Sequence, residues 1–194
     1  MTRTMRDSTT AADIPLAGLD LVAGYGNGRW KWTPADWARF GAMPRVVIDV
    51  LGTAPATCSV LDVETGDATP ATAPNWVKER AKAIPRAYCT IYCDQTTRPA
   101  VKAEMDAKSL RVGIDYQWWI ATLDGTEVLA DMTGVVAVQY AGESMTKGHW
   151  DQSIVYDDAW HAPPVEPWMR DLEIRLQQIS AAAAQAAAIV KQHM

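Results

Sequence analysis

The stretch Cys58-Ser59-Val60-Leu61-Asp62-Val63-Glu64-Thr65-Gly66-Asp67 runs from an apolar segment directly into a polar turn. Residues 58–63 carry the β-branched and apolar side chains that strands favour. In a strand, side chains at positions i and i+2 project from the same face, about 6.5–7 Å apart along the chain. Asp62 and Glu64 are therefore predicted to point together from the end of a buried strand.

Strand-like runs alternate with helical patterns around this stretch. Strands are predicted over residues 19–25, 45–51, 58–63, 87–93, 117–121, 135–140 and 151–156, and helices over 72–84, 99–110 and a segment that opens at Thr33-Pro34. Continuous apolar strands that alternate with helices favour parallel strands buried on both faces. A β/α barrel and an open α/β sheet both satisfy this pattern. Because few helical patterns separate the later strands, the predicted fold class is α/β, a short and irregular TIM-like barrel.

The 194 residues divide into four predicted parts. Residues 1–17 form a polar N-terminal arm, 18–161 the barrel domain, 162–167 a proline-rich connector, and 168–194 a C-terminal helix. The helix carries apolar or small residues at alternating three- and four-residue spacing: Met169, Leu172, Leu176, Ile179, Ala183, Ala186 and Val190. That heptad pattern predicts a coiled coil, with a helix folded back on its own barrel as the alternative. The broad apolar face favours a homo-oligomer, taken as a trimer.

Composition narrows the classes of partner. Hydrophobic residues make up 48% of the chain and charged residues 21%, which is typical of a globular protein. The formal net charge is −5 and no basic stripe is present, so neither nucleic acid nor an anionic surface is an expected partner. No apolar run is long enough to span a bilayer, and no membrane association is expected. Neither a metal site nor a cofactor is predicted, since the cysteines lack zinc spacing and Gly24-x-Gly26-x-Gly28 lacks the dinucleotide-binding spacing.

The pair Asp62 and Glu64 has the chemistry of glycosidic cleavage. In β/α barrels, active sites lie at the C-terminal ends of the strands, where this pair is predicted to lie. Cleavage needs one carboxyl group that stays protonated, to donate to the leaving oxygen, and a carboxylate that supports positive charge on the sugar. Crowding two acids together raises the pKa of one and leaves the other ionised. By itself the triplet is also compatible with a strand that ends in a solvated turn.

Further segments carry a resemblance to a known family. They are Leu61-Asp62-Val63-Glu64, Gly66-Asp67-Ala68-Thr69-Pro70, Ala73-Pro74-Asn75-Trp76-Val77, Ile91-Tyr92-Cys93, Trp119-Ile120-Ala121, Val138-Gln139-Tyr140 and Trp150-Asp151-Gln152-Ser153. In their order and spacing, these segments resemble the family 25 glycoside hydrolases, and more closely the lysozyme-like domains of actinobacteria and their phages. The resemblance covers about residues 19–160.

The resemblance implies roles for particular residues. Glu64 is implied as the proton donor, Asp62 as its charged partner, and Asp151 as a further acid at the barrel mouth. The predicted substrate-binding residues, which would line a sugar groove at the strand ends, are Tyr25, Asn27, Tyr92, Trp119, Gln139 and Tyr140. Only one of the neighbours Trp118 and Trp119 can face the barrel interior, because side chains alternate along a strand.

One feature of the resemblance has no match where it is expected. Family enzymes carry an aspartate at the end of the first strand, but the predicted first strand ends in Tyr25-Gly26-Asn27. Asp20 precedes the apolar run and would lie at the wrong end of that strand. Asp49 replaces the acid only if it faces the mouth. With that acid missing, positive charge on the sugar would be less well stabilised, and the sequence leaves open whether the barrel hydrolyses glycan or only binds it.

Three functions compete at this level. We favour a phage virion or tail protein whose barrel recognises bacterial cell-wall polysaccharide and could also cleave it, with other virion proteins as further partners. The alternatives are a free endolysin of the muramidase type and a purely structural oligomeric tail protein with an inactive barrel. Residues 1–13 lack the apolar region of a secretory signal, so synthesis in the host cytoplasm and a place in the virion are expected.

Overall fold

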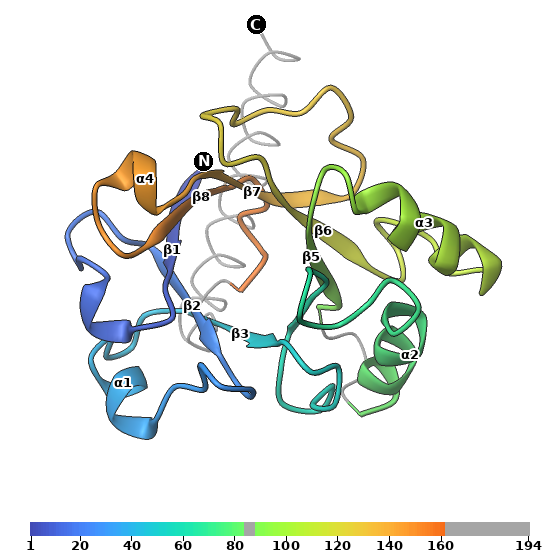
Figure 1. Ribbon diagram of the computed structural model, residues 1–194, viewed down its shortest axis with the longest axis horizontal. Coiled ribbons are helices and arrows are strands. Elements are labelled where there is room, and N and C mark those ends of the chain that lie inside the picture. The colour runs from blue at the N-terminus through green and yellow to red at the C-terminus, as the bar shows by residue number, and fades with distance from the viewer. Residues whose placement is uncertain (84–87, 162–194) are drawn as a thin grey trace, which may run out of the picture. The chain divides into compact units, whose positions relative to one another are not determined.

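Eight strands close into a barrel with its helices on the outside (Figure 1). The computed structural model describes residues 1–83 and 88–161. Its elements are β1 (Arg3–Asp7), η1 (Ala11–Asp13), β2 (Leu21–Tyr25), α1 (Pro34–Ala38), β3 (Arg45–Asp49), β4 (Val60–Asp62), α2 (Ala73–Ala83), β5 (Thr90–Asp94), α3 (Arg98–Ala107), β6 (Gln117–Ala121), β7 (Val135–Ala141), α4 (Glu143–Thr146) and β8 (Asp151–Val155). The predicted barrel is confirmed.

The strands follow one another around the barrel in sequence order. Strands β1 to β7 pair in parallel, and β8 pairs antiparallel with both β7 and β1, which closes the sheet. The sequence pattern favoured parallel strands, and β8 is the exception to that prediction. Because β8 runs in the opposite direction, its first residue lies at the end of the barrel where the parallel strands have their last residues.

The first strand of the barrel lies inside the segment that the sequence sets apart as a polar arm. Strand β1 pairs with β8 over its whole length and with β2 through residues 5–7, so the predicted first strand is the second one observed. Met5 is the only apolar side chain of β1, which therefore lacks a hydrophobic signal. The two arginines of β1 form hydrogen bonds to backbone carbonyl groups. Arg3 donates to the carbonyls of Asp157 and Trp160, and Arg6 donates to the carbonyl of Pro15.

Alternation along the strands divides the core into an interior cluster and an outer cluster. The interior cluster includes Met5, Leu21, Ile48, Val60, Tyr92, Trp119, Ala137, Val155 and Trp160. The outer cluster includes Leu61, Trp76, Val77, Ile91, Val101, Met105 and Trp118, and it packs between the sheet and helices α2 and α3 (Figure 1). Of the two neighbouring tryptophans, Trp119 is therefore the one that faces inward. The buried Trp160 donates from Nε1 to Thr90 Oγ1 at 3.0 Å, at the start of β5, and so closes the end of the barrel opposite the strand ends.

Helix α1 begins as its sequence predicts. Thr33 is the N-cap, and its hydroxyl accepts from the backbone N–H of Asp36 at 3.2 Å. The Asp36 carboxylate accepts from the backbone N–H of Thr33 at 2.7 Å, which completes a capping box. Pro34 occupies the first helical position, where no intrahelical N–H is needed.

Helix α3 ends in a Schellman motif whose left-handed residue is not a glycine. Ser109 has φ of 58°, and the backbone N–H of Leu110 donates to the carbonyl of Met105 at 3.0 Å. Because Ser109 is exposed, replacing it with glycine removes backbone strain without removing a packed side chain. We expect Ser109→Gly to raise the free energy of unfolding by about 0.5–1 kcal/mol, measured by urea denaturation. An unchanged or lower midpoint would contradict this expectation.

The predicted connector 162–167 and the predicted coiled-coil helix 168–194 lie outside the described residues. Within the described ranges, no helix combines the length and the hydropathy needed to cross a membrane.

Candidate active site

Three aspartates meet at one end of the barrel because of strand direction and register. Asp7 ends β1 and Asp62 ends β4, while Asp151 begins the antiparallel β8. Asp7 and Asp151 are direct partners in the β1–β8 ladder, where opposed Cα atoms lie about 5 Å apart. Glu64 follows two residues after Asp62, beyond the end of β4. We call Asp7, Asp62, Glu64 and Asp151 the acid cluster.

Asp7 is the acid that the sequence interpretation did not find. It ends the first strand of the barrel, which is the position where the resemblance implies an aspartate. Neither substitute considered from the sequence takes this position. Asp20 accepts from the backbone N–H of Thr4 near the start of β1, at 2.8 Å. Asp49 is fully buried on the side of β3 that faces α2. The sequence offers little signal for Asp7, because Met5 is the only apolar residue in the strand that Asp7 ends.

The two interior aspartates are buried with incomplete hydrogen bonding. Asp7 is 5% exposed and Asp62 is 4% exposed. Within the described part of the chain, Oδ1 of Asp7 and Oδ1 of Asp62 are buried without a hydrogen-bond partner. Buried polar atoms normally have partners, and exceptions gather at functional sites. These two oxygens are therefore placed to interact with a substrate or with water in the mouth.

Burial and nearby carboxyl groups raise the pKa of every member of the acid cluster. Burial is the largest cause for Asp7, whose pKa lies well above its usual range, followed by the charges of Asp151 and Glu64. For Asp62, burial is the largest cause of the raised pKa, and the charge of Glu64 is the second largest. The pKa of Asp151 rises to about 6, through burial and the charge of Glu143. Burial, then Asp94 and Asp67, raises the pKa of Glu64. The cluster therefore keeps protons at a pH where isolated carboxyl groups have lost theirs.

Two tyrosines and a glutamine surround the acids. The pKa of Tyr25 is raised far above its usual range, by burial and by the charges of all four acids, which places its hydroxyl among them. Tyr92 Oη donates to Gln139 Oε1, and the Gln139 amide hydrogen-bonds to Asp151. Tyr92 also lies close enough to Glu64 to lower the pKa of that carboxyl group. Tyr92 and Gln139 therefore lie between Glu64 and Asp151 and contact both acids.

Of the other predicted binding residues, Trp119 lies inside the barrel, whereas Tyr140 and Asn27 hydrogen-bond to residues outside the acid cluster. Trp119 is buried in the interior cluster, where its Nε1 donates to Ser153 Oγ at 3.0 Å. It therefore supports the floor of the mouth. Tyr140 packs against the outer cluster and its hydroxyl accepts from Gln152, away from the acids. Asn27 Nδ2 donates to Asp49 Oδ1 at 2.6 Å, and Asn27 Oδ1 accepts from the backbone N–H of Val50 at 3.0 Å. The structure brings neither Tyr140 nor Asn27 into the acid cluster.

Asp49 organises the loops on one side of the mouth. Its carboxylate accepts from four consecutive backbone N–H groups, those of residues 51–54, at 2.7–3.3 Å. It also accepts from Asn27 Nδ2 and from Trp76 Nε1, the latter at 2.8 Å. The carboxylate thus joins the loop after β3, the loop after β2 and helix α2.

We expect Asp49→Ala to destabilise the fold by about 2–3 kcal/mol, because it leaves several buried donors without an acceptor. Urea denaturation of the variant and the wild type measures this difference. Asp13→Ala is a matched control, since Asp13 has no resolved side-chain partner among the described residues. Equal unfolding midpoints for Asp49→Ala and Asp13→Ala would contradict the expectation.

The acid cluster also makes the stability of the fold depend on pH. Above the ordinary aspartate pKa of 3.8, an unfolded chain releases protons that the folded cluster retains, because the pKa of Asp151 is raised to about 6 and the pKa values of Asp7 and Asp62 are also raised well above 3.8. Where the folded state binds more protons, stability falls as pH rises. We therefore expect a higher melting temperature at about pH 5 than at about pH 8, measured by scanning calorimetry. A melting temperature that rises over this interval would contradict the raised pKa values.

Two pockets flank the loop that follows β4, at the same end of the barrel. One, of about 430 Å³, is lined by Glu64 together with residues 65–70 and the start of α3. The other, of about 300 Å³, is lined by Arg29, Trp30, Leu51 and residues 65–67. The residues shared by both pockets are Thr65, Gly66 and Asp67. The mouth thus extends sideways from the acids into two adjoining hollows.

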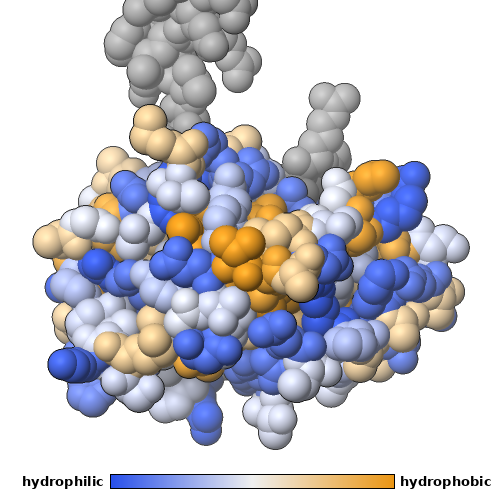
Figure 2. Space-filling view, turned by 90° about the horizontal axis from the view of Figure 1, so that it is seen from above, coloured by the Kyte–Doolittle hydropathy of each residue, from blue (hydrophilic) through white to orange (hydrophobic). Residues whose placement is uncertain are grey.

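An apolar rim lies on the other side of the mouth. A Cβ at Gly142 would lie 3.5 Å from Leu123 Cδ2 and 3.7 Å from Asp151 Oδ1, so Leu123 stands beside the acid cluster. Leu123 and Met145 are about half exposed, and Leu123 has φ of 56°. Figure 2 shows a face of the molecule on which hydrophilic and hydrophobic side chains are mixed, with a strongly hydrophobic area near its centre.

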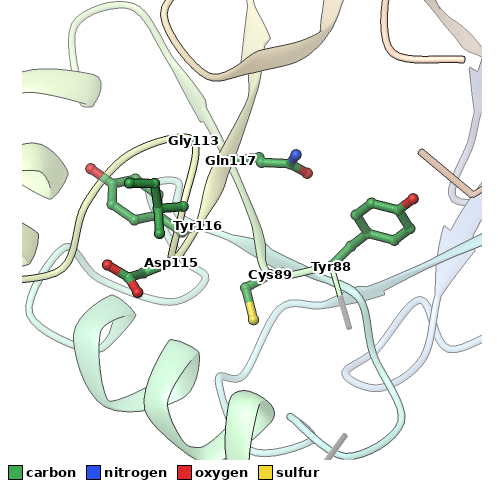
Figure 3. Close-up of a pocket in the computed structure, with 7 residues that line it drawn as sticks. Tyr88, Cys89, Gly113, Asp115, Tyr116 and Gln117 are labelled. Carbon is green, nitrogen blue, oxygen red and sulfur yellow. The ribbon is translucent and has the colours of Figure 1, made fainter. Parts of the chain in front are cut away.

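A smaller pocket lies at the opposite end of the barrel. It has a volume of about 180 Å³ and is lined by residues 88–89, before β5, and by residues 113–117, before and at the start of β6 (Figure 3). Asp115 at this pocket is held by Arg111, whose Nε lies 3.1 Å from Asp115 Oδ2. The pocket contains no member of the acid cluster, so it is separate from the candidate active site.

Comparison with solved structures identifies proteins with a similar fold. No protein-family model matches the sequence, and no curated protein matches it. Among solved structures, the chain is similar to a family 25 glycosyl hydrolase from Bacillus anthracis, with a TM-score of 0.53 and 13% identity over 81% of this chain and 90% of that chain. It is also similar to the spore cortex lytic enzyme SleM from Clostridium perfringens, with a TM-score of 0.51 and 12% identity over 80% of this chain and 67% of that chain. The described barrel has the fold of the family 25 glycosyl hydrolases, as the sequence resemblance implies.

Proposed function

We propose that this protein is a glycoside hydrolase that cleaves the glycan of bacterial peptidoglycan. The observation that carries the proposal is the acid cluster: four carboxyl groups with raised pKa values at the C-terminal end of the barrel strands. The names of the structural neighbours support the substrate class, since one is a glycosyl hydrolase and the other a spore cortex lytic enzyme.

The roles of the acids follow from their surroundings. Glu64 is half-buried and lines the 430 Å³ pocket, and its raised pKa favours the protonated form that a general acid needs. In the proposed reaction, Glu64 gives its proton to the glycosidic oxygen as the bond from that oxygen to the sugar carbon breaks. Positive charge develops on the sugar, and the ionised carboxylates among Asp7, Asp62 and Asp151 stabilise it. A water molecule then adds to the sugar carbon and gives one proton to the Glu64 carboxylate, which restores the acid and completes the hydrolysis.

Purified peptidoglycan provides the test. We expect the wild-type protein to release new reducing sugar ends from it, with Glu104→Gln equally active, because Glu104 is an exposed residue of α3. Release of free amino groups without reducing ends would show cleavage of the peptides and contradict the proposal. Retention on insoluble peptidoglycan without any release would favour the alternative, a barrel that only binds cell-wall polysaccharide.

We further propose that several copies of the barrel are held together through residues 168–194, as part of a virion or tail assembled after synthesis in the host cytoplasm. The heptad spacing of that segment supports the proposal. Light scattering of the intact protein is expected to give a mass near three chains, and truncation after His161 is expected to give monomers. A monomeric mass for the intact protein would contradict self-association and favour a free endolysin.

A further inference from the structure

A buried hydroxyl group joins the first and last strands just beyond the point where their ladder ends. The pair of the β1–β8 ladder that lies nearest the mouth is Asp7 with Asp151. Ser8 follows Asp7 directly and is 6% exposed. Its Oγ donates to the backbone carbonyl of His149 at 2.5 Å. Because His149 precedes Asp151 by two residues, this hydrogen bond connects the two strands directly beside their acids.

The backbone of Ser8 is also connected to the neighbouring strand β2. The carbonyl of Ser8 accepts from Trp32 Nε1 at 3.2 Å, and the backbone N–H of Trp32 donates to the carbonyl of Tyr25 at 2.9 Å. Trp32 is 4% exposed and lies so close to β2 that a Cβ at Gly24 would be 2.5 Å from Trp32 Cε3. Ser8 therefore links three strands of the mouth: its own strand β1, the end of β2, and the segment that leads into β8.

The acids beside this connection repel each other when both are ionised. Burial first, and then the charge of Asp151, raises the pKa of Asp7. Carboxylates on two directly opposed strand residues favour any movement that separates them or admits water between them. The β1–β8 ladder ends at this pair, and beyond it the hydroxyl of Ser8 holds the two segments together. The hydrogen bond thus opposes the separation that the two charges favour.

We propose that Ser8 is a positioning residue for hydrolysis, which acts with Trp32 to fix the spacing of Asp7 and Asp151 and the place of Tyr25. This inference rests on the proposed function, because the buried Ser8 acts through the acids of that site. The placement of the acids matters most in the transition state, where charge develops on the sugar, and matters less for binding of the substrate. Loss of the Ser8 hydroxyl should therefore lower kcat and leave KM nearly unchanged.

Ser59 provides a matched control elsewhere in the barrel. Ser59 is 5% exposed, and its hydroxyl hydrogen-bonds to the backbone of Val47. It directly precedes β4, at the end of that strand opposite Asp62. Ser59→Ala and Ser8→Ala each remove one buried hydroxyl that bonds to backbone, so both are expected to lower stability by a similar amount. Only Ser8→Ala changes a contact beside the acid cluster.

Kinetics of reducing-end release from soluble peptidoglycan fragments test the proposal. We expect Ser8→Ala to lower kcat by about 10- to 100-fold with KM within about twofold of the wild type, since a misplacement of about 1 Å can cost this much. Ser59→Ala is expected to keep the wild-type kcat. Trp32→Phe keeps an aromatic ring against Phe40 but lacks the donor to Ser8, and a smaller loss of about three- to tenfold in kcat is expected.

The assays are run below the lowest melting temperature of the set, so that every variant is folded. If Ser8→Ala keeps the wild-type kcat, raises KM alone, or loses no more kcat than Ser59→Ala, the positioning role is wrong while the proposed hydrolase stands. If Ser8→Ala does not fold, Trp32→Phe decides, and a wild-type kcat for that variant overturns the role. If the wild type releases no reducing ends, the proposed function fails and the positioning role fails with it.

Discussion

Glu64→Gln is expected to lower the rate of reducing-end release from peptidoglycan by about 10²–10⁴-fold, the usual contribution of a positioned general acid. The amide is nearly isosteric but has no acidic proton to give to the glycosidic oxygen. Because Glu64 lines the mouth and is not part of either core cluster, the fold should tolerate the change. The loss should therefore appear in the rate, with the melting temperature at least as high as that of the wild type.

Glu104→Gln is the matched control for this experiment, since it removes an equivalent carboxyl group from the exposed face of α3. A wild-type rate for the control together with the loss for Glu64→Gln assigns the effect to the mouth. Equal rates for Glu64→Gln and the wild type would remove Glu64 as the proton donor.

Asp7→Asn is expected to change activity and stability in opposite directions. The rate of hydrolysis should fall by about 10²–10³-fold, because the site loses one of the charges that stabilise positive charge on the sugar. The melting temperature should rise, most of all at about pH 8, because a buried carboxylate opposite Asp151 no longer has to ionise in the folded state. Activity assays and calorimetry over a range of pH measure the two effects on the same samples.

Asp20→Asn is the control for Asp7, since Asp20 is the other aspartate near the start of the chain that could match the family pattern. Asp20 accepts a hydrogen bond from the backbone N–H of Thr4, at the end of β1 away from the acid cluster. The Asp20→Asn variant should therefore keep the wild-type rate of hydrolysis. If Asp20→Asn loses activity and Asp7→Asn does not, the assignment of the first-strand acid is wrong.

The part of the fold that could be predicted is the part with a strong local signal. Strands β2 to β7 carry runs of apolar residues, and helix α1 carries its capping residues at Thr33 and Asp36. Strand β1 has no such signal, because its arginines are stabilised by carbonyl groups far along the chain, such as those of Asp157 and Trp160. The direction of β8 was equally hidden, since hydrophobic periodicity does not distinguish parallel from antiparallel pairing.

The candidate site followed the same division. Asp62 and Glu64 could be predicted to lie together because their spacing is local, and the resemblance added Asp151, Tyr92 and Gln139. Asp7 could not be found without β1, and its place opposite Asp151 depends on the pairing of the first and last strands. Asn27 and Asp49 looked suitable for the mouth, but they hydrogen-bond to each other and to loop backbone, a partnership that no sequence pattern indicates.

A crystal structure of the Glu64→Gln variant with a bound peptidoglycan oligosaccharide tests the central claim most directly. We predict that a glycosidic oxygen lies within hydrogen-bond distance of the residue 64 side chain, about 3 Å, with the neighbouring sugar facing Asp7 and Asp151. An oligosaccharide bound away from these acids, for instance at the opposite end of the barrel near Tyr116, would contradict a hydrolytic site at this mouth.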